Sequence, residues 1–160
     1  MLTYRKATPG DAEILARTRI TFLSEIGAQQ ESATDMAYLH GQNLRYFAEA
    51  LGDGSFAAFL AYEGDELVAT SGVSFFKLPP NRPCPDGKVA YISNMYTAPH
   101  YRGRGIATHL FELTVEEAAV RGHTKLLLNA TAMGRPIYEK FGFKDAGSDM
   151  VYYIRKEPRP

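Results

Sequence analysis

The fold of this chain is decided by one stretch, Met95-Tyr-Thr-Ala-Pro-His-Tyr-Arg-Gly-Arg-Gly-Ile-Ala-Thr108. A strand-like run enters the stretch from Val89, and an apolar pattern with helical spacing leaves it from Ile106. Glycines between them permit positive φ angles, so that several backbone N–H groups can converge on one anion. The first turn of the following helix adds N–H groups without internal partners and a partial positive charge. The stretch therefore predicts a phosphate-binding turn between a strand and a helix.

Two glycines and two arginines carry this prediction. Gly103 and Gly105 supply the conformational freedom, and Arg102 and Arg104 add positive charge. These four residues alone fit a disordered basic segment or an ordinary surface turn better than a phosphate site. The strand before them and the helix after them favour the phosphate-binding interpretation.

Composition indicates one ordinary globular domain. The chain has 160 residues, of which 45% are hydrophobic and 22% charged. This length and composition predict a single domain over residues 1–160 with a core of its own. Eighteen basic residues are balanced by eighteen acidic ones, so that the net charge is zero. We therefore expect no nucleic-acid partner, and we expect any anion site to be local.

The one cysteine and the hydropathy pattern exclude further classes. Cys84 has no second cysteine for an internal disulfide or a site of several thiolates. Its position between Pro83 and Pro85 indicates a loop, which does not favour a catalytic thiol. The sequence has no apolar signal core and no run near the roughly 20 apolar residues of a membrane span. We expect a cytoplasmic protein without a membrane partner.

Before the motif, segments whose apolar residues recur at every second position are interspersed with segments whose apolar residues have helical spacing. The expected elements are a strand at residues 2–7, helices at 9–26 and 32–51, strands at 56–62 and 67–77, and a proline-rich loop at 78–87. Thr8 and Pro9 are suited to the N-cap and first position of the first helix. Glu63-Gly-Asp65 predicts a tight turn, so that the two strands form a hairpin.

From the motif onward, a strand, a helix and a strand follow one another. The expected elements are strands at residues 88–97, 126–130 and 150–155, and helices at 106–121 and 134–141. The first strand–helix–strand sequence predicts a βαβ unit with two parallel strands and a right-handed crossover. The whole order predicts an α/β fold of three layers. Its central sheet is mixed and largely antiparallel, with helices on both faces and one parallel βαβ unit.

Three motifs in this order resemble those of the GNAT superfamily, the acetyl-CoA-dependent N-acetyltransferases. Arg102-Gly-Arg-Gly105-Ile-Ala107 matches the family signature Q/R-x-x-G-x-G/A, and the strand before it ends in the family-like Met95-Tyr-Thr97. Pro136-Ile-Tyr138-Glu-Lys-Phe-Gly-Phe143 resembles a second family motif. The resemblance covers nearly the whole chain. It implies a GNAT-like fold with acetyl-CoA as cosubstrate. It also implies transfer of the acetyl group to a primary amine by direct attack in a ternary complex.

The resemblance also implies where the coenzyme binds. The pyrophosphate is expected at residues 102–108, and the amides of the pantetheine arm on the backbone of the preceding strand. The family places a polar side chain after the second parallel strand, near Asn129 and Thr131, for which a simple strand-end turn is an equal interpretation. The residues expected to bind the coenzyme are Met95, Tyr96, Thr97, Arg102, Gly103, Arg104, Gly105, Ile106, Ala107, Thr108, Asn129, Thr131, Gly134 and Tyr138.

Catalytic roles follow from the same resemblance. Tyr138 is expected to be the general acid that protonates the departing thiolate, although its spacing alone is typical of a core aromatic. The central strand has no carboxylate that could remove the proton of the amine. We therefore expect a water relay held by Ser93 or Asn94, or loss of the proton to bulk solvent. Glu25 of the first helix is a further candidate for contact with the amine.

The remaining expectations concern metals, partners and a second function. His40, His100, His109 and His123 lack Glu or Cys at ligand spacing, so we expect no metal. The acceptor is expected to be a small metabolite, an amino acid, an antibiotic or a peptide terminus, and a homodimer is left open. The missing strand carboxylate leaves one alternative function, a non-catalytic acyl-CoA-binding module that senses or regulates.

Overall fold

A computed structural model describes residues 1–27 and 33–153 of the chain. The chain divides into two compact units, Met1–Asn129 and Ala130–Pro160. Within the described residues, the first unit contains every strand and the longer helices, and the second contains one short helix. The first unit therefore carries the framework of the fold.

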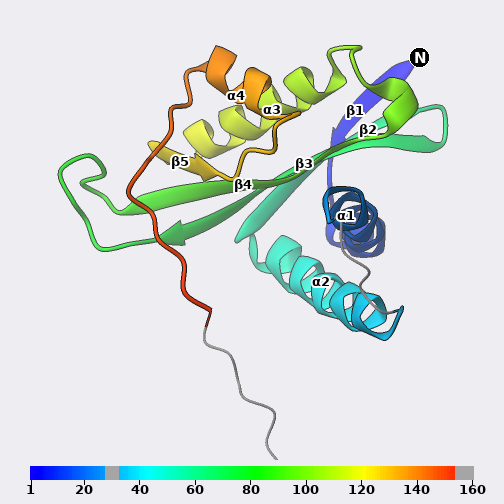
Figure 1. Cartoon of the computed structure of the whole chain (residues 1–160), viewed down its shortest axis with the longest axis horizontal. Helices are drawn as coiled ribbons and strands as arrows, with labels where there is room; N and C mark the ends of the chain where they lie inside the picture. The colour runs from blue at the N-terminus through cyan, green and yellow to red at the C-terminus, as the bar shows by residue number, and fades with distance from the viewer. Residues whose placement is uncertain (28–32, 154–160) are drawn as a thin grey trace, which may run out of the picture. The chain divides into compact units, whose positions relative to one another are not determined.

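The first unit is built on a five-stranded mixed sheet (Figure 1). Its strands are β1 (Leu2–Lys6), β2 (Phe56–Glu63), β3 (Glu66–Lys77), β4 (Lys88–Thr97) and β5 (Lys125–Leu128). They lie in sequence order across the sheet, with β1 to β4 antiparallel and β5 parallel to β4. The predicted mixed, largely antiparallel sheet with one parallel pair is confirmed.

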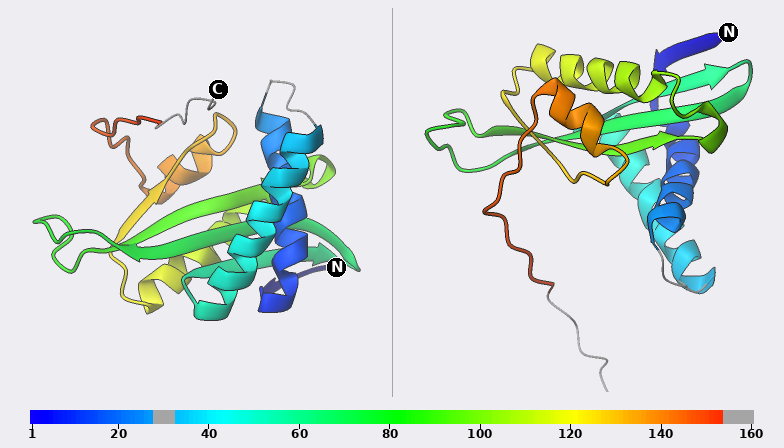
Figure 2. Two further views of the ribbon diagram at one scale, coloured as in Figure 1. Left: turned by 90° about the horizontal axis from the view of Figure 1, so that it is seen from below. Right: turned by 45° about the horizontal axis from the view of Figure 1, so that its top comes forward.

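Helices cover both faces of this sheet (Figure 2). The helical segments are η1 (Pro9–Asp11), α1 (Ala12–Ile26), α2 (Ala33–Asp53), η2 (Pro99–Tyr101), α3 (Ile106–Val120) and, in the second unit, α4 (Arg135–Phe141). The helices α1 and α2 lie side by side on one face, and α3 lies on the other. Within residues 1–27 and 33–153, every helix is too short or too polar to cross a membrane.

The strand β2 shows why the sheet is covered on both faces. Successive side chains of a strand point to opposite faces, and here both sets are apolar and buried. Phe56, Ala58 and Leu60 belong to the cluster formed with α1 and α2. Phe59 and Ala61 belong to the cluster formed with α3. The strand β2 therefore joins two hydrophobic cores, one on each side of the sheet.

The element bounds differ from the predicted ones by a few residues. The first helix starts as the 3-10 turn η1 and becomes an α-helix at Ala12. The second helix continues to Asp53, and its predicted first residue, Ser32, lies outside the described residues. The strand β5 ends at Leu128, two residues before its predicted end at residue 130. The order and type of these elements are as predicted.

The predicted final strand at residues 150–155 is wrong for the part that the structure describes. Residues 150–153 form no strand, and residues 154 and 155 lie outside the described part of the chain. Met150, Val151, Tyr152 and Tyr153 are all exposed. A strand forms only where a neighbouring strand pairs its backbone groups, and an apolar pattern cannot show whether such a neighbour is present.

Candidate functional site

The strand β4 has a free edge over its second half. β5 pairs only with Val89 to Ile92 of β4, whereas β4 continues to Thr97. On its other side, β4 remains paired with β3 as far as Thr97. Among the described residues, positions 93–97 therefore have no strand neighbour on the β5 side. A strand edge of this kind can pair with the amides of an extended ligand.

A glycine loop leads from this strand into α3. Gly103 and Gly105 have φ angles of 75° and 79°, which confirms the predicted positive φ at both positions. A Cβ added to either glycine would meet no atom within 4 Å, so the backbone conformation, not crowding, calls for glycine. The helix α3 begins at Ile106, directly after Gly105, and its free N–H groups lie at this end. The loop and the helix start together suit an anion.

The side chains of the two loop arginines are held by other parts of the first unit. Arg102 Nη2 lies 2.5 Å from Glu25 Oε2, and its Nε donates to the Thr97 carbonyl oxygen at 2.9 Å. Arg104 Nη2 lies 3.4 Å from Glu63 Oε1. These charged side chains are between 32% and 44% exposed, and such ion pairs contribute about 0.2–1 kcal/mol. Exchange of either carboxylate for a phosphate therefore costs little.

Glu25 joins three elements near the edge of β4. Besides its ion pair with Arg102, its Oε1 accepts a hydrogen bond from Tyr96 Oη at 3.2 Å. Partial burial, and then the nearby Glu25 carboxylate, raise the pKa of Tyr96. Glu25 thus lies near the end of α1 and contacts both β4 and the glycine loop. Its contact with an acceptor amine stays a prediction.

An irregularity at Asn94 interrupts β4. The pairing with β3 shifts there, and Asn94 has a φ of 54°, a conformation that asparagine adopts more readily than most residues. Its side chain is buried, and its Oδ1 accepts a hydrogen bond from Arg19 Nη1 at 2.8 Å. Its Nδ2 is buried without a hydrogen-bond partner in the described structure. Ser93 lies beside it, opposite Gly72. The water relay at Ser93 or Asn94 stays a prediction.

Arg19 is a residue of this region that the sequence reasoning missed. It comes seven, four and three residues after Ala12, Leu15 and Ala16, the buried residues of α1. At 3.6 residues per turn, these spacings place Arg19 on the buried side of the helix. A charged residue in line with a buried apolar stripe was therefore the signal in the sequence.

The second unit contains the predicted general acid. Tyr138 of α4 is 6% exposed, and burial raises the pKa of its phenol. A Cβ at Gly134 would lie 2.9 Å from Tyr138 Cε2 and 3.0 Å from its Oη, so glycine leaves room for the ring. Thr131 Oγ1 accepts a hydrogen bond from the Gly134 N–H at 3.2 Å. The structure thus gathers Thr131, Gly134 and Tyr138 in the second unit, whereas Asn129 is an exposed residue at the end of the first.

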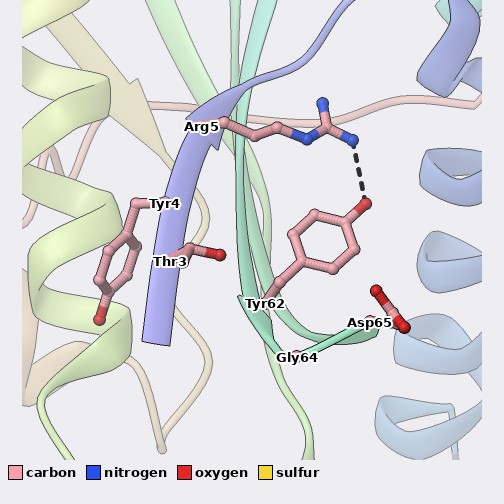
Figure 3. Close-up of a pocket in the computed structure, with 6 residues that line it drawn as sticks. All are labelled: Thr3, Tyr4, Arg5, Tyr62, Gly64 and Asp65. Carbon is pink, nitrogen blue, oxygen red and sulfur yellow. Dashed lines mark hydrogen bonds between the residues drawn. The ribbon is translucent and has the colours of Figure 1, made fainter. Parts of the chain in front are cut away.

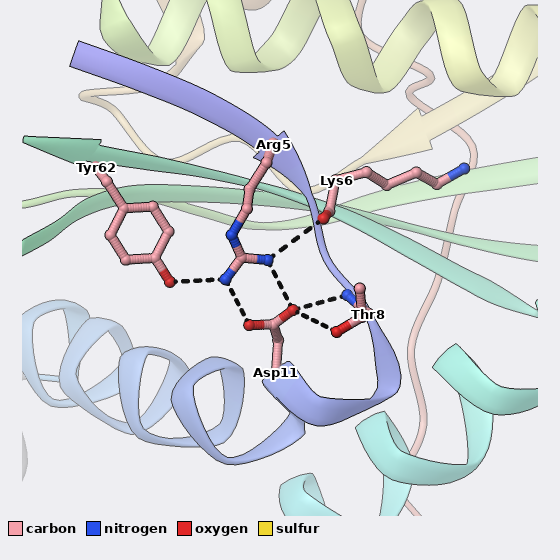
Figure 4. A network of polar contacts seen from close by, with 5 residues as sticks. All are labelled: Arg5, Lys6, Thr8, Asp11 and Tyr62. Carbon is pink, nitrogen blue, oxygen red and sulfur yellow. Dashed lines mark hydrogen bonds and ion pairs between the residues drawn. The ribbon is translucent and has the colours of Figure 1, made fainter. Parts of the chain in front are cut away.

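A separate hollow lies at the β1 edge of the sheet (Figure 3). Its volume is about 370 Å³, and it is lined by Thr3, Tyr4, Arg5, Tyr62, Gly64 and Asp65. Arg5 is already bound to both carboxylate oxygens of Asp11, at 2.8 Å and 2.7 Å (Figure 4). The guanidinium of Arg5, which lines this hollow, is therefore already neutralised by Asp11. Over residues 1–27 and 33–153, no group of three or more His, Cys, Asp or Glu side chains is placed to hold a metal ion.

The open edge of β4 and the glycine loop before α3 form an arrangement in an α/β fold that suits an extended, phosphorylated ligand. The chain belongs to the acetyltransferase (GNAT) family, whose sequence profile matches residues 22–143. This match confirms the resemblance that the motifs indicated.

Solved structures of similar proteins agree with this assignment. A predicted acetyltransferase from Clostridium acetobutylicum, solved with acetyl-CoA, is 32% identical with a TM-score of 0.88, over 96% of this chain and 97% of that one. A GCN5-related N-acetyltransferase from Ralstonia eutropha JMP134 is 29% identical with a TM-score of 0.86, over 96% and 99% of the two chains. The fold of this chain is therefore that of GNAT acetyltransferases.

One curated relative is an uncharacterized N-acetyltransferase, YsnE, from Bacillus subtilis (strain 168). It is 29% identical over 89 residues, which cover 52% of this chain and 53% of that protein. This chain thus spans about half the length of the curated relative that it matches.

Proposed function

We propose that this protein is an acetyl-CoA-dependent N-acetyltransferase that transfers an acetyl group to a primary amine by direct attack in a ternary complex. The observation that carries the proposal is the free edge of β4 at residues 93–97, which continues directly into the glycine loop and the start of α3. A ligand with an amide-bearing arm and a pyrophosphate suits this combination. The similar protein from Clostridium acetobutylicum, which was solved with acetyl-CoA, supports the same choice.

In this proposal, residues of the first unit would bind the coenzyme along its length. The backbone of Met95, Tyr96 and Thr97 would pair with the amides of the pantetheine arm, because this side of β4 has no strand partner among the described residues. The N–H groups of residues 103–108 would hold the pyrophosphate at the start of α3. Arg102 and Arg104 would add charge by leaving their weak ion pairs.

The chemistry needs an acyl donor, a free amine and a proton for the leaving group. Acetyl-CoA supplies an activated acetyl group with a thiolate as the leaving group. A phenol of ordinary pKa about 10 is protonated at neutral pH, and Tyr138 would be the proton donor to this thiolate. The proton of the amine would leave through water beside Ser93 or Asn94, or to bulk solvent. Glu25 would contact the amine.

Release of free thiol in the presence of a panel of amines tests the proposal. The panel contains small metabolites, amino acids, antibiotics and peptide N-termini, and mass spectrometry identifies the N-acetylated product. We expect at least one amine to accelerate thiol release from acetyl-CoA above the hydrolytic background. If acetyl-CoA binds but no amine accelerates thiol release, the protein is instead a non-catalytic acyl-CoA-binding module.

A further inference from the structure

Arg19 places a cation beside the irregular part of β4. The residue is neither buried nor fully exposed, and its Nη1 donates to Asn94 Oδ1 at 2.8 Å. Asn94 is itself 4% exposed and immediately precedes the segment proposed to hold the acyl donor. The contact therefore holds the guanidinium next to the β4 segment proposed to bind the acyl donor, on the face of the sheet that α1 covers.

Among the described residues, no carboxylate neutralises this guanidinium. Six of the other described arginines have a carboxylate within 4 Å, namely Arg5, Arg17, Arg102, Arg104, Arg121 and Arg135. Burial lowers the pKa of Arg19, and the groups that oppose this effect are the phenols of Tyr46 and Tyr91. Phenols are uncharged at neutral pH, so they do not supply the missing negative charge.

The contact with Asn94 leaves N–H donors of Arg19 available to an anionic ligand. A guanidinium has five N–H donors in a planar fork, and Asn94 accepts from one of its nitrogens. A half-buried cation that is paired only with an amide has lost hydration without gaining an opposite charge. A carboxylate can recover this loss, because two parallel N–H···O bonds match the fork of a guanidinium.

We propose that Arg19 binds a carboxylate of the amine acceptor, so that the acceptors are amino-acid-like molecules that carry both an amine and a carboxylate. This inference rests on the proposed acetyltransferase function and narrows its substrate class. Tyr46 and Tyr91 form part of the same surroundings: Tyr46 Oη lies 2.7 Å from Ser74 Oγ, and Ser74 pairs with Tyr91 across the sheet. The carboxylate thus lies among hydroxyl groups, near the β4 segment where the amine would attack.

Matched sets of three amines test the proposal. Each set contains an amino acid, its carboxamide and the corresponding decarboxylated amine, which share one amine and one side chain. We expect kcat/KM for the acid to exceed the values for both analogues by about tenfold or more, in line with one bidentate charged contact. In Arg19→Gln this preference should disappear, while the KM for acetyl-CoA stays within about twofold of the wild-type value.

Two further variants separate recognition from folding. Arg17→Gln removes an exposed arginine of the same helix, whose partner is Glu13 at 3.6 Å, and should keep the full preference. Arg19→Lys keeps the charge without the planar fork and should restore part of the preference. A deaminated acid, which cannot be acetylated, should raise the unfolding temperature of the wild-type protein and of Arg17→Gln but not that of Arg19→Gln.

The possible outcomes distinguish the two proposals. Equal kcat/KM for the acid and its carboxamide, or a preference that survives Arg19→Gln, overturns the carboxylate proposal and leaves the acetyltransferase function supported. Absence of acetylation with every amine overturns the proposed function, and the carboxylate proposal falls with it. A preference that is lost in Arg19→Gln and partly restored in Arg19→Lys supports both.

Discussion

At the scale of single residues, backbone conformation marks the candidate coenzyme site. Asn94 has a φ of 54° at the irregularity of β4, and Gly103 and Gly105 have φ angles of 75° and 79° in the loop after it. An L side chain in the left-handed region costs about 1–2 kcal/mol, so such positions persist only where the surrounding structure requires them. Glycine avoids this cost, so of the three residues Asn94 bears it, directly before the segment proposed to hold acetyl-CoA.

Substitution of one loop glycine tests whether this conformation matters. Gly105→Ala should lower the free energy of unfolding by about 1–2 kcal/mol, because the left-handed conformation penalises a Cβ. It should also weaken acetyl-CoA binding, because the loop N–H groups would move. Gly41→Ala, in the middle of α2, is the control and should raise stability by up to about 1 kcal/mol. Urea unfolding measures the change in stability, and equilibrium binding measures the change in affinity for acetyl-CoA. A change in the free energy of unfolding with the same sign in both variants would contradict the argument.

The phenol of Tyr138 can be tested by removal of one oxygen atom. Tyr138→Phe should lower kcat by about 10²–10⁴, the usual contribution of a positioned general acid, because the leaving thiolate loses its proton donor. The KM for acetyl-CoA should change little, since the ring remains in its place beside Gly134. Steady-state kinetics measures both parameters. Tyr152→Phe, at an 87% exposed tyrosine, is the control, and an unchanged kcat in Tyr138→Phe would remove the assignment.

At the scale of elements, a charged hydrogen-bond network around Asp11 connects β1 to the start of α1 (Figure 4). Asp11 of η1 accepts two hydrogen bonds from Arg5 of β1, and further ones from the backbone and hydroxyl of Thr8, at 2.7 Å and 3.0 Å. Arg5 also donates to Tyr62 Oη of β2 at 3.1 Å. One carboxylate thus ties the edge of the sheet to the start of the first helix.

The network around the Asp11 carboxylate predicts a dependence of stability on pH. The hydrogen bonds from Arg5, and then those from Thr8, outweigh burial and hold the pKa of the Asp11 carboxyl well below its usual range. The folded state therefore binds this proton more weakly than the unfolded state does. The stabilising contribution is fully present above the ordinary pKa of about 4 and is lost as the pH falls from there toward the folded pKa.

Asp11→Asn should lower the free energy of unfolding by about 1–3 kcal/mol at pH 7, because Arg5 loses a charged acceptor. The difference from the wild-type protein should shrink below about pH 4, where the wild-type carboxyl begins to lose the same contribution. Urea unfolding between pH 3 and pH 7 measures this trend. Asp65→Asn, at an exposed turn residue, should change stability little at any pH. A loss in Asp11→Asn that is independent of pH would contradict the linkage argument.

At the scale of the whole molecule, local patterns in the sequence predicted most of the fold. Alternation and turn residues placed β1 to β5 and their connecting helices within a few residues, because each pattern is a property of one segment. The final strand at residues 150–155 could not be judged in this way, since a strand depends on a neighbour that its own sequence does not reveal. Residues 150–153 form none.

The candidate site was predicted unevenly for the same reason. The conformations of Gly103 and Gly105 followed from the loop itself and are confirmed. The contact between Arg19 and Asn94 joins residues 75 positions apart, on a helix and on an irregular strand. No short motif contains both of them. The contact between Arg102 and Glu25, at a separation of 77 residues, was equally hidden from local reasoning.

The ion pair between Arg102 and Glu25 has a consequence for the order in which ligands bind. If the pyrophosphate of acetyl-CoA takes Arg102, Glu25 loses its cation and becomes available to an ammonium group. The two ligands would then bind cooperatively, and thermodynamic linkage requires the effect to be equal in both directions.

With unreactive CoA in place of acetyl-CoA, we expect each ligand to lower the dissociation constant of the other by the same factor, up to about fivefold. Calorimetric titrations in both orders measure this factor. Glu25→Gln should reduce it to about one, although both ligands still bind. A single surface ion pair would thereby favour the complex of the protein with both ligands over the complexes with one ligand alone.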